Sequence, residues 1–205
     1  MKFTKIPANT FKELQMNAGI LVDTFTPADS TIGTIIGATS GGVNFTATPT
    51  YEDFGEDIDN CPKNTLELKQ LTDWEVKMSG TFKTVNTVLA KRLLAVADIN
   101  PDDTTKITPR REIALTDFAD IWWVGDLGKN DGFLAIHMMN TLNTAGFSIQ
   151  STDKGKGDFA FEFTAHFSMD AQDTVPFEIY VNNPAEADEG DEGDEGDEGG
   201  EGGEG

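Results

Sequence analysis

The segment from Gly157 to Phe167 constrains the fold more than any other part of the chain. Every second position in it is apolar, and these positions are Phe159, Phe161, Phe163, Ala165 and Phe167. Side chains of a β-strand point alternately to its two faces, so a strand would place these residues on one face and a largely polar row on the other. A helix would scatter the rings around its circumference. A strand with one apolar face needs a second layer to bury it, which favours a β-sandwich or barrel.

Other segments continue the same pattern. Residues 72–83 alternate strictly, and further strand candidates lie at 118–125, 133–140, 146–152 and 175–181. Strands joined by such short turns pair antiparallel, because parallel strands need longer crossovers. The Ser40-Gly41-Gly42 turn between residues 34–38 and 43–48 predicts one more hairpin. The sequence therefore predicts a mainly β fold, an antiparallel β-sandwich or barrel.

One segment, residues 84–97, has apolar residues at helical spacing. Thr84 or Asn86 is suited to cap its start, and Asp98 with Pro101 is suited to end it. We therefore expect one α-helix that flanks the sandwich.

Two segments of the sequence lack a clear pattern of sandwich strands. Residues 1–32 are interpreted as a possible N-terminal arm, and residues 49–71 as a long loop or arm, since ordered loops of this length usually have a function. The second interval carries five carboxylates within eight positions, at Glu52, Asp53, Glu56, Asp57 and Asp59. They lack the order of a calcium-binding loop, so a solvated or subunit-contacting loop is the favoured interpretation.

The charge of the chain divides it into two parts. Its net charge is −21, and eleven of its 36 acidic residues lie from Glu186 onward, which leaves −10 for the body. The Asp/Glu/Gly-rich end cannot bury enough apolar surface to order itself. We therefore expect a single β domain over residues 1–183 and a disordered acidic tail over residues 184–205. An acidic body also disfavours tight binding to nucleic-acid phosphates.

Cysteine content and hydropathy indicate the compartment. Cys61 is the only cysteine, so no intrachain disulfide is expected. The longest early apolar stretch, residues 18–22, is too short for a signal peptide core or a membrane span. These features predict synthesis in a reducing cytoplasm and no membrane partner.

No catalytic motif stands out. His137 and His166 have no adjacent cysteine and no metalloprotease or catalytic-triad signature, so both are interpreted as polar-face or interface residues. Trp122 and Trp123 must face opposite ways on a strand, and one ring is expected in the core and the other in a subunit contact. We expect no enzymatic activity, no catalytic residue, no metal site and no cofactor.

An ordered set of motifs spans residues 10 to 181. Along the chain these are Asn17-Ala-Gly-Ile-Leu, the Gly37–Pro49 segment, Glu56-Asp-Ile-Asp, Trp74-Glu-Val-Lys-Met-Ser-Gly-Thr-Phe with its helix, Asp153-Lys-Gly-Lys-Gly with the Phe-rich strand, and Pro176-Phe-Glu-Ile-Tyr-Val. This order resembles the major tail tube proteins of long-tailed, non-contractile bacteriophages that infect Gram-positive hosts. The acidic tail lies outside the resemblance.

The resemblance implies a structural role. It implies hexameric rings in which a sheet from each copy joins a β-barrel around a lumen, stacked into the tube through which the genome leaves. The implied partners are identical copies, the tape measure and terminator proteins at the tube ends, and DNA in transit without specific binding. The implied location is the virion tail, after synthesis in the host cytoplasm. The acidic loop is then expected at a subunit junction, through Glu52, Asp53, Phe54, Glu56, Asp57 and Asp59.

A second interpretation belongs to a different class. A monomeric β-sandwich binding or decoration module could use a tryptophan for a carbohydrate, or the acidic loop for calcium. The sequence does not decide which polar strand face would line a lumen.

Overall fold

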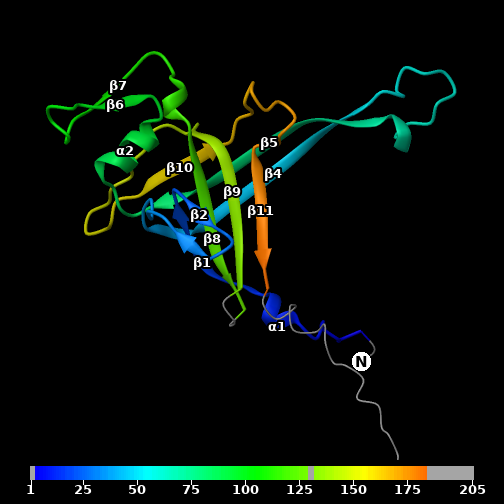
Figure 1. The fold of residues 1–205 in the computed structure, drawn as a ribbon, viewed down its shortest axis with the longest axis horizontal. Helices are drawn as coiled ribbons and strands as arrows, with labels where there is room; N and C mark the ends of the chain where they lie inside the picture. The colour runs from blue at the N-terminus through cyan, green and yellow to red at the C-terminus, as the bar shows by residue number, and fades with distance from the viewer. Residues whose placement is uncertain (1–2, 129–131, 184–205) are drawn as a thin grey trace, which may run out of the picture.

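The computed structural model describes residues 3–128 and 132–183, so the acidic tail at 184–205 lies outside the described residues. The described part is mainly β, with a seven-stranded antiparallel sheet and two small two-stranded sheets (Figure 1). The strands are β1 (Gln15–Val22), β2 (Phe25–Thr26), β3 (Thr31–Ile32), β4 (Thr39–Asp53), β5 (Lys69–Phe82), β6 (Ala97–Ile99), β7 (Ile107–Pro109), β8 (Ala119–Leu127), β9 (Gly132–Asn143), β10 (Phe159–Thr164) and β11 (Phe177–Asn182). The helices are α1 (Thr10–Glu13), α2 (Thr87–Leu94) and the 3-10 turns η1 (Leu66–Leu68) and η2 (Leu115–Asp117). None of these helices has the length and hydropathy needed to cross a membrane.

The large sheet folds into a sandwich because two different strands pair with the same edge of β9. It pairs with β8 along one side, while its other side pairs with β11 over residues 133–138 and with β10 at residues 142–143. One limb is therefore β1-β8-β9-β11 and the other is β4-β5-β10. The core lies between the limbs and takes side chains from both, including Leu21, Val76, Met78, Phe82, Ile121, Trp123, Met138, Phe161 and Phe163. The predicted β-sandwich with one main flanking helix is confirmed.

The Phe-rich strand is β10, and its alternation is confirmed for most of its length. Phe159, Phe161 and Phe163 are buried, as is Ala165, while the intervening residues are exposed or half-buried. The prediction is wrong at Phe167, which is 43% exposed. Strand β10 ends at Thr164, and the chain then leaves the sheet for a turn at residues 168–171, so the period of two no longer applies.

The predicted hairpin at residues 40–42 is also wrong. Residues 39–53 form one strand, and Gly41 and Gly42 (φ 80° and 83°) create a bulge opposite β5, where the register shifts between Ser40 and Val43. Positive φ at two successive glycines suits a tight hairpin turn and a bulge alike, so the local sequence could not distinguish them. The preceding residues 34–36 pair with β1 instead, through Ile36 N–H donating to Leu21 O at 2.9 Å.

Helix α2 is shorter than the predicted 84–97 segment at both ends. Its start follows the expected cap, since Asn86 Oδ1 accepts the Leu89 N–H at 2.8 Å. Its end comes at Ala95, where φ is 63°. Leu89 and Leu93 face the core, whereas Val88 is 68% exposed.

Candidate functional site

The β4–β5 hairpin extends well beyond the sandwich (Figure 1). Its pairing runs from Thr39 opposite Phe82 out to Asp53 opposite Lys69, with an irregularity after Thr50. The sandwich buries only the proximal part, where Val76, Met78 and Phe82 face the core. We call residues 51–72 the tip segment, because no other described element of the chain pairs with its strands.

The six predicted contact residues all lie in the tip segment. Glu52 and Asp53 end β4, and Phe54, Glu56, Asp57 and Asp59 lie in the connection that follows. All are exposed except the half-buried Asp53. The predicted loop boundaries of 49–71 were too wide, since residues 49–53 and 69–71 are paired strand. The alternation of Val43, Phe45 and Ala47 continues to Pro49 and Tyr51, so a signal for the longer β4 was present, whereas Lys69-Gln70-Leu71 gives no such pattern.

Asp53 organises the tip instead of facing outward. Its Oδ1 accepts the Gly55 N–H at 2.9 Å, and its Oδ2 accepts the Asn64 N–H at 2.8 Å. These backbone bonds, with that from Asn64 the larger cause, hold the pKa of the Asp53 carboxyl below its ordinary value. The two bonds join both sides of the connection, so we assign Asp53 a structural role within the tip.

The tip is expected to loosen in acid through Asp53. A carboxyl whose pKa is lower in the folded state stabilises that state above its unfolded pKa of about 3.9, and this stabilisation is lost as the pH falls through the folded pKa. We therefore expect the Gly55 and Asn64 amide protons to lose protection from exchange below about pH 4. NMR hydrogen exchange measures this directly.

The Asp53→Ala variant should show the same loss at pH 7. Asp57→Ala is the matched control, because among residues 3–128 and 132–183 no hydrogen bond or ion pair involves the Asp57 side chain. Protected Gly55 and Asn64 amides in Asp53→Ala would contradict the assigned role.

The tip also exposes apolar side chains that the sequence reasoning missed, apart from Phe54. The exposed fractions are 55% for Tyr51, 50% for Phe54, 52% for Ile58, 84% for Leu66 and 49% for Leu71. An isolated two-stranded ribbon is marginally stable at best, and contiguous exposed apolar patches mark interaction sites. The available signal was the apolar residues scattered through an interval that is otherwise polar.

The charges of the tip are mostly uncompensated. Glu56 lies 3.7 Å from Lys63 Nζ, and Lys69 Nζ lies 5.2 Å from the centroid of the Tyr51 ring. Within the described part of the chain, Glu52, Asp57 and Asp59 form no ion pair. The described residues also contain no group of three or more His, Cys, Asp or Glu side chains able to hold a metal ion. The arrangement is an apolar and anionic surface suited to contact with another macromolecule.

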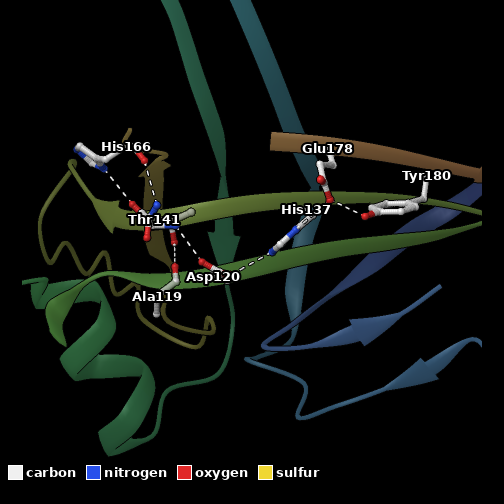
Figure 2. Close-up of polar contacts among 8 residues, drawn as sticks. Ala119, Asp120, His137, Thr141, His166, Glu178 and Tyr180 are labelled. Atoms are coloured by element: carbon white, nitrogen blue, oxygen red, sulfur yellow. Dashed lines mark hydrogen bonds and ion pairs between the residues drawn. The ribbon is translucent and has the colours of Figure 1, made fainter. Parts of the chain in front are cut away.

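The two histidines make polar contacts that join neighbouring strands of the large sheet (Figure 2). His137 stacks on Trp122 with ring centroids 4.0 Å apart, and its Nε2 lies 3.2 Å from Asp120 Oδ2. On its other side, Nδ1 lies 3.6 Å from Glu178 Oε2 on β11. The His137–Glu178 contact joins β9 to β11, and Tyr180, which is also on β11, donates a hydrogen bond to the same Glu178 carboxylate.

His166 connects the end of β10 to β9. Its Nδ1 lies 3.1 Å from Asn140 O, and Asn140 Nδ2 donates to His166 O at 3.3 Å. Asn140 N–H donates in turn to Asp120 Oδ1 at 2.9 Å. Figure 2 shows that the His137 and His166 contacts meet at Asp120.

The adjacent tryptophans Trp122 and Trp123 are both buried by their own chain. They lie on opposite faces of β8, as the strand pattern predicted, and are 7% (Trp122) and 8% (Trp123) exposed. Trp123 faces the sandwich core and donates to Ala18 O at 3.0 Å. Trp122 lies on the other face, where Phe25 packs edge-on at 5.7 Å. The expectation that one ring makes a subunit contact is therefore wrong, because the β2–β3 hairpin already covers that face.

No protein-family model matches the chain, and no curated protein matches it either.

Proposed function

We propose that the chain is a structural subunit that self-assembles into stacked, hexameric rings and so forms the tail tube of a long-tailed, non-contractile bacteriophage. In this role it is made in the host cytoplasm, resides in the virion tail and lets DNA pass without specific binding. Identical copies are its main partners, with tape measure and terminator proteins at the tube ends. The motif order along residues 10–181 and the antiparallel sandwich with its flanking helix support the proposal.

The observation that carries the proposal is the tip segment. It extends the hairpin past the sandwich, exposes five large apolar side chains and leaves Glu52, Asp57 and Asp59 without an ion pair among the described residues. Exposing these apolar side chains to water is unfavourable in free energy, and contact with another macromolecule would bury them. For a self-assembling subunit, that macromolecule is a second copy of the same chain. Because like charges repel, the acidic residues of the tip would favour a region of the second copy that is apolar and carries few acidic residues.

A second feature suits a conduit. The face of β4, β5 and β10 that points away from the core carries exposed or half-buried polar side chains, and Thr144 contacts two of them, Glu162 and Thr164. The polar residues of this face are Asn44, Thr46, Thr48, Ser79, Thr81, Glu162 and Thr164. Lys77 on this face forms an ion pair with Glu75, and the hydrogen bond to Glu75 raises the Lys77 pKa. Lys83, just beyond the end of β5, pairs with Asp158. Without an excess of positive charge, this face lacks the counterion release that makes proteins bind nucleic-acid phosphates tightly. We assign this face to the lumen wall.

Excising the tip tests the proposal. Residues 51–72 are replaced by Asn-Gly, which joins Thr50 directly to its partner Asp73 through a two-residue hairpin turn. We expect a folded, soluble body that forms no rings or tubes, measured by circular dichroism, analytical ultracentrifugation and negative-stain microscopy. The unmodified chain should assemble under the same conditions.

A pair of point variants isolates the apolar contribution. Phe54→Ser with Ile58→Ser removes two half-exposed side chains from the tip and should prevent assembly. Val85→Ser with Val88→Ser removes comparably exposed side chains near α2 and is the control. Normal tubes formed by the chain that lacks residues 51–72 would disprove the role of the tip. A wild-type chain that stays monomeric at every concentration would disprove the proposed function itself.

A further inference from the structure

The two ends of strand β8 lie at two exposed apolar features of the body. The strand begins at Ala119, directly after η2, and ends at Leu127, directly before Gly128. At the second end, Gly128 N–H donates to Leu14 O at 2.8 Å and so anchors the N-terminal segment. Nine residues of strand separate the two ends by about 27 Å.

The N-terminal segment, residues 3–14, exposes apolar side chains that the body does not bury. Helix α1 within it has no buried residue. Ile6 is 64% exposed, Phe11 is 72% exposed and Leu14 is 43% exposed. In Figure 1 the segment leaves the body at the end where β11 also terminates.

The opposite end of β8 carries a groove of about 450 Å³. The residues that line it are Leu115, Phe118, Asn140, His166, Phe167, Ser168, Met169 and Asp170. Three of its apolar side chains are strongly exposed, Leu115 at 90%, Met169 at 83% and Phe167 at 43%. In Figure 1 the loop between β10 and β11 that supplies most of this lining lies at the far end of β11 from α1.

The charges of the two features are complementary. In this strongly acidic chain, residues 1–14 contain three lysines and only one acidic residue, Glu13. The loop of residues 165–176 contains Asp170 and Asp173 and no lysine or arginine. Opposite charges at the rim of a contact steer association and fix its orientation, while the apolar side chains supply the buried area.

We propose that the N-terminal segment of one copy packs into this groove of the next copy, with Phe11 among the groove's apolar side chains and Lys12 beside Asp170. The contact joins two different surfaces at opposite ends of the body, so it is heterologous and can repeat without closing. It gives the assembly a head-to-tail stacking axis that is separate from the β4–β5 tip. The inference rests on the self-association that the proposed function requires.

Cysteine cross-linking tests this contact. In a Cys61→Ser background, Phe11→Cys and Met169→Cys are placed in the same chain, and the sample is oxidised under assembly conditions. Non-reducing electrophoresis should show a ladder of multimers. Single-cysteine chains should stay monomeric alone and give only a dimer when the two kinds are mixed. An internal disulfide, a dimer from one kind alone or the absence of cross-links would overturn the contact.

Charge reversal supplies an independent readout. Lys12→Glu should reduce the ladder, and adding Asp170→Lys in the same chain should restore it, whereas Asp57→Lys in its place should not. Failure of the rescue would overturn the assigned pairing. Microscopy of the same samples distinguishes this contact from the proposed tail-tube function. Tubes that form without the cross-link would overturn only the contact. A ladder of multimers without tubes would support the contact and contradict the tail-tube function.

Discussion

Replacing Phe163 with alanine is expected to lower the free energy of unfolding by about 3–5 kcal/mol, the usual cost of removing a buried aromatic side chain. Phe163 is 1% exposed and lies in the centre of the core, opposite Met78 on β5 and with its ring 5.2 Å from that of Phe161. Phe163 belongs to a close-packed core cluster with residues from both limbs, and these neighbours cannot collapse into the space without losing their own contacts. Urea denaturation followed by tryptophan fluorescence measures the change.

Phe167 is the matched control for this substitution. It belongs to the same sequence pattern but is 43% exposed beyond the end of β10. Phe167→Ala is expected to cost less than about 1 kcal/mol, because little apolar area returns to water. Phe163→Leu should fall between the two. Equal losses at positions 163 and 167 would contradict the observed end of the strand.

The second large effect is expected at Asn143, a buried polar residue at the end of β9. Its Nδ2 donates to Leu93 O at 2.6 Å and to Gly146 O at 2.9 Å, and its Oδ1 accepts the Glu162 N–H at 2.9 Å. One side chain thus joins the end of helix α2 to strands β9 and β10. Asn143→Ala would leave buried donors and acceptors without partners, and we expect a loss of about 2–3 kcal/mol in the free energy of unfolding.

Thr144 provides the comparison for Asn143. It also contacts β10, through Thr144 Oγ1 and Thr164 Oγ1 at 2.8 Å, but its side chain is exposed to water. Thr144→Ala is therefore expected to cost less than about 1 kcal/mol. Chemical denaturation of both variants checks the difference. A smaller loss for Asn143→Ala than for Thr144→Ala would show that the α2 connection does not hold the limbs together.

Local patterns in the sequence predicted the local structure well. The alternation at Phe159, Phe161 and Phe163 predicted a buried strand face, and Asn86 was one of two predicted helix caps, because both signals depend only on neighbouring residues. Long-range choices were not predictable in the same way. The Gly41–Gly42 bulge, the pairing of residues 34–36 with β1 and the double use of β9 depend on where distant strands lie.

The candidate site was located from its charge but not from its shape. The structure places all six residues predicted for a subunit contact in the tip segment, and the contact itself stays a prediction. The apolar members Tyr51, Ile58, Leu66 and Leu71 were missed, and the last three follow no period because no core imposes one there. Asp53 looked like its acidic neighbours in the sequence, and only its bonds to Gly55 and Asn64 distinguish it.

Strand β9 has a consequence for how the molecule comes apart. Because its upstream part holds β11 and its final residues hold β10, neither limb can separate without disrupting a strand that the other limb needs. The body should therefore behave as one cooperative folding unit, not as two that melt in turn. A mechanical force applied to the tip segment would therefore be transmitted to the whole core, and the body would unfold in one step instead of strand by strand.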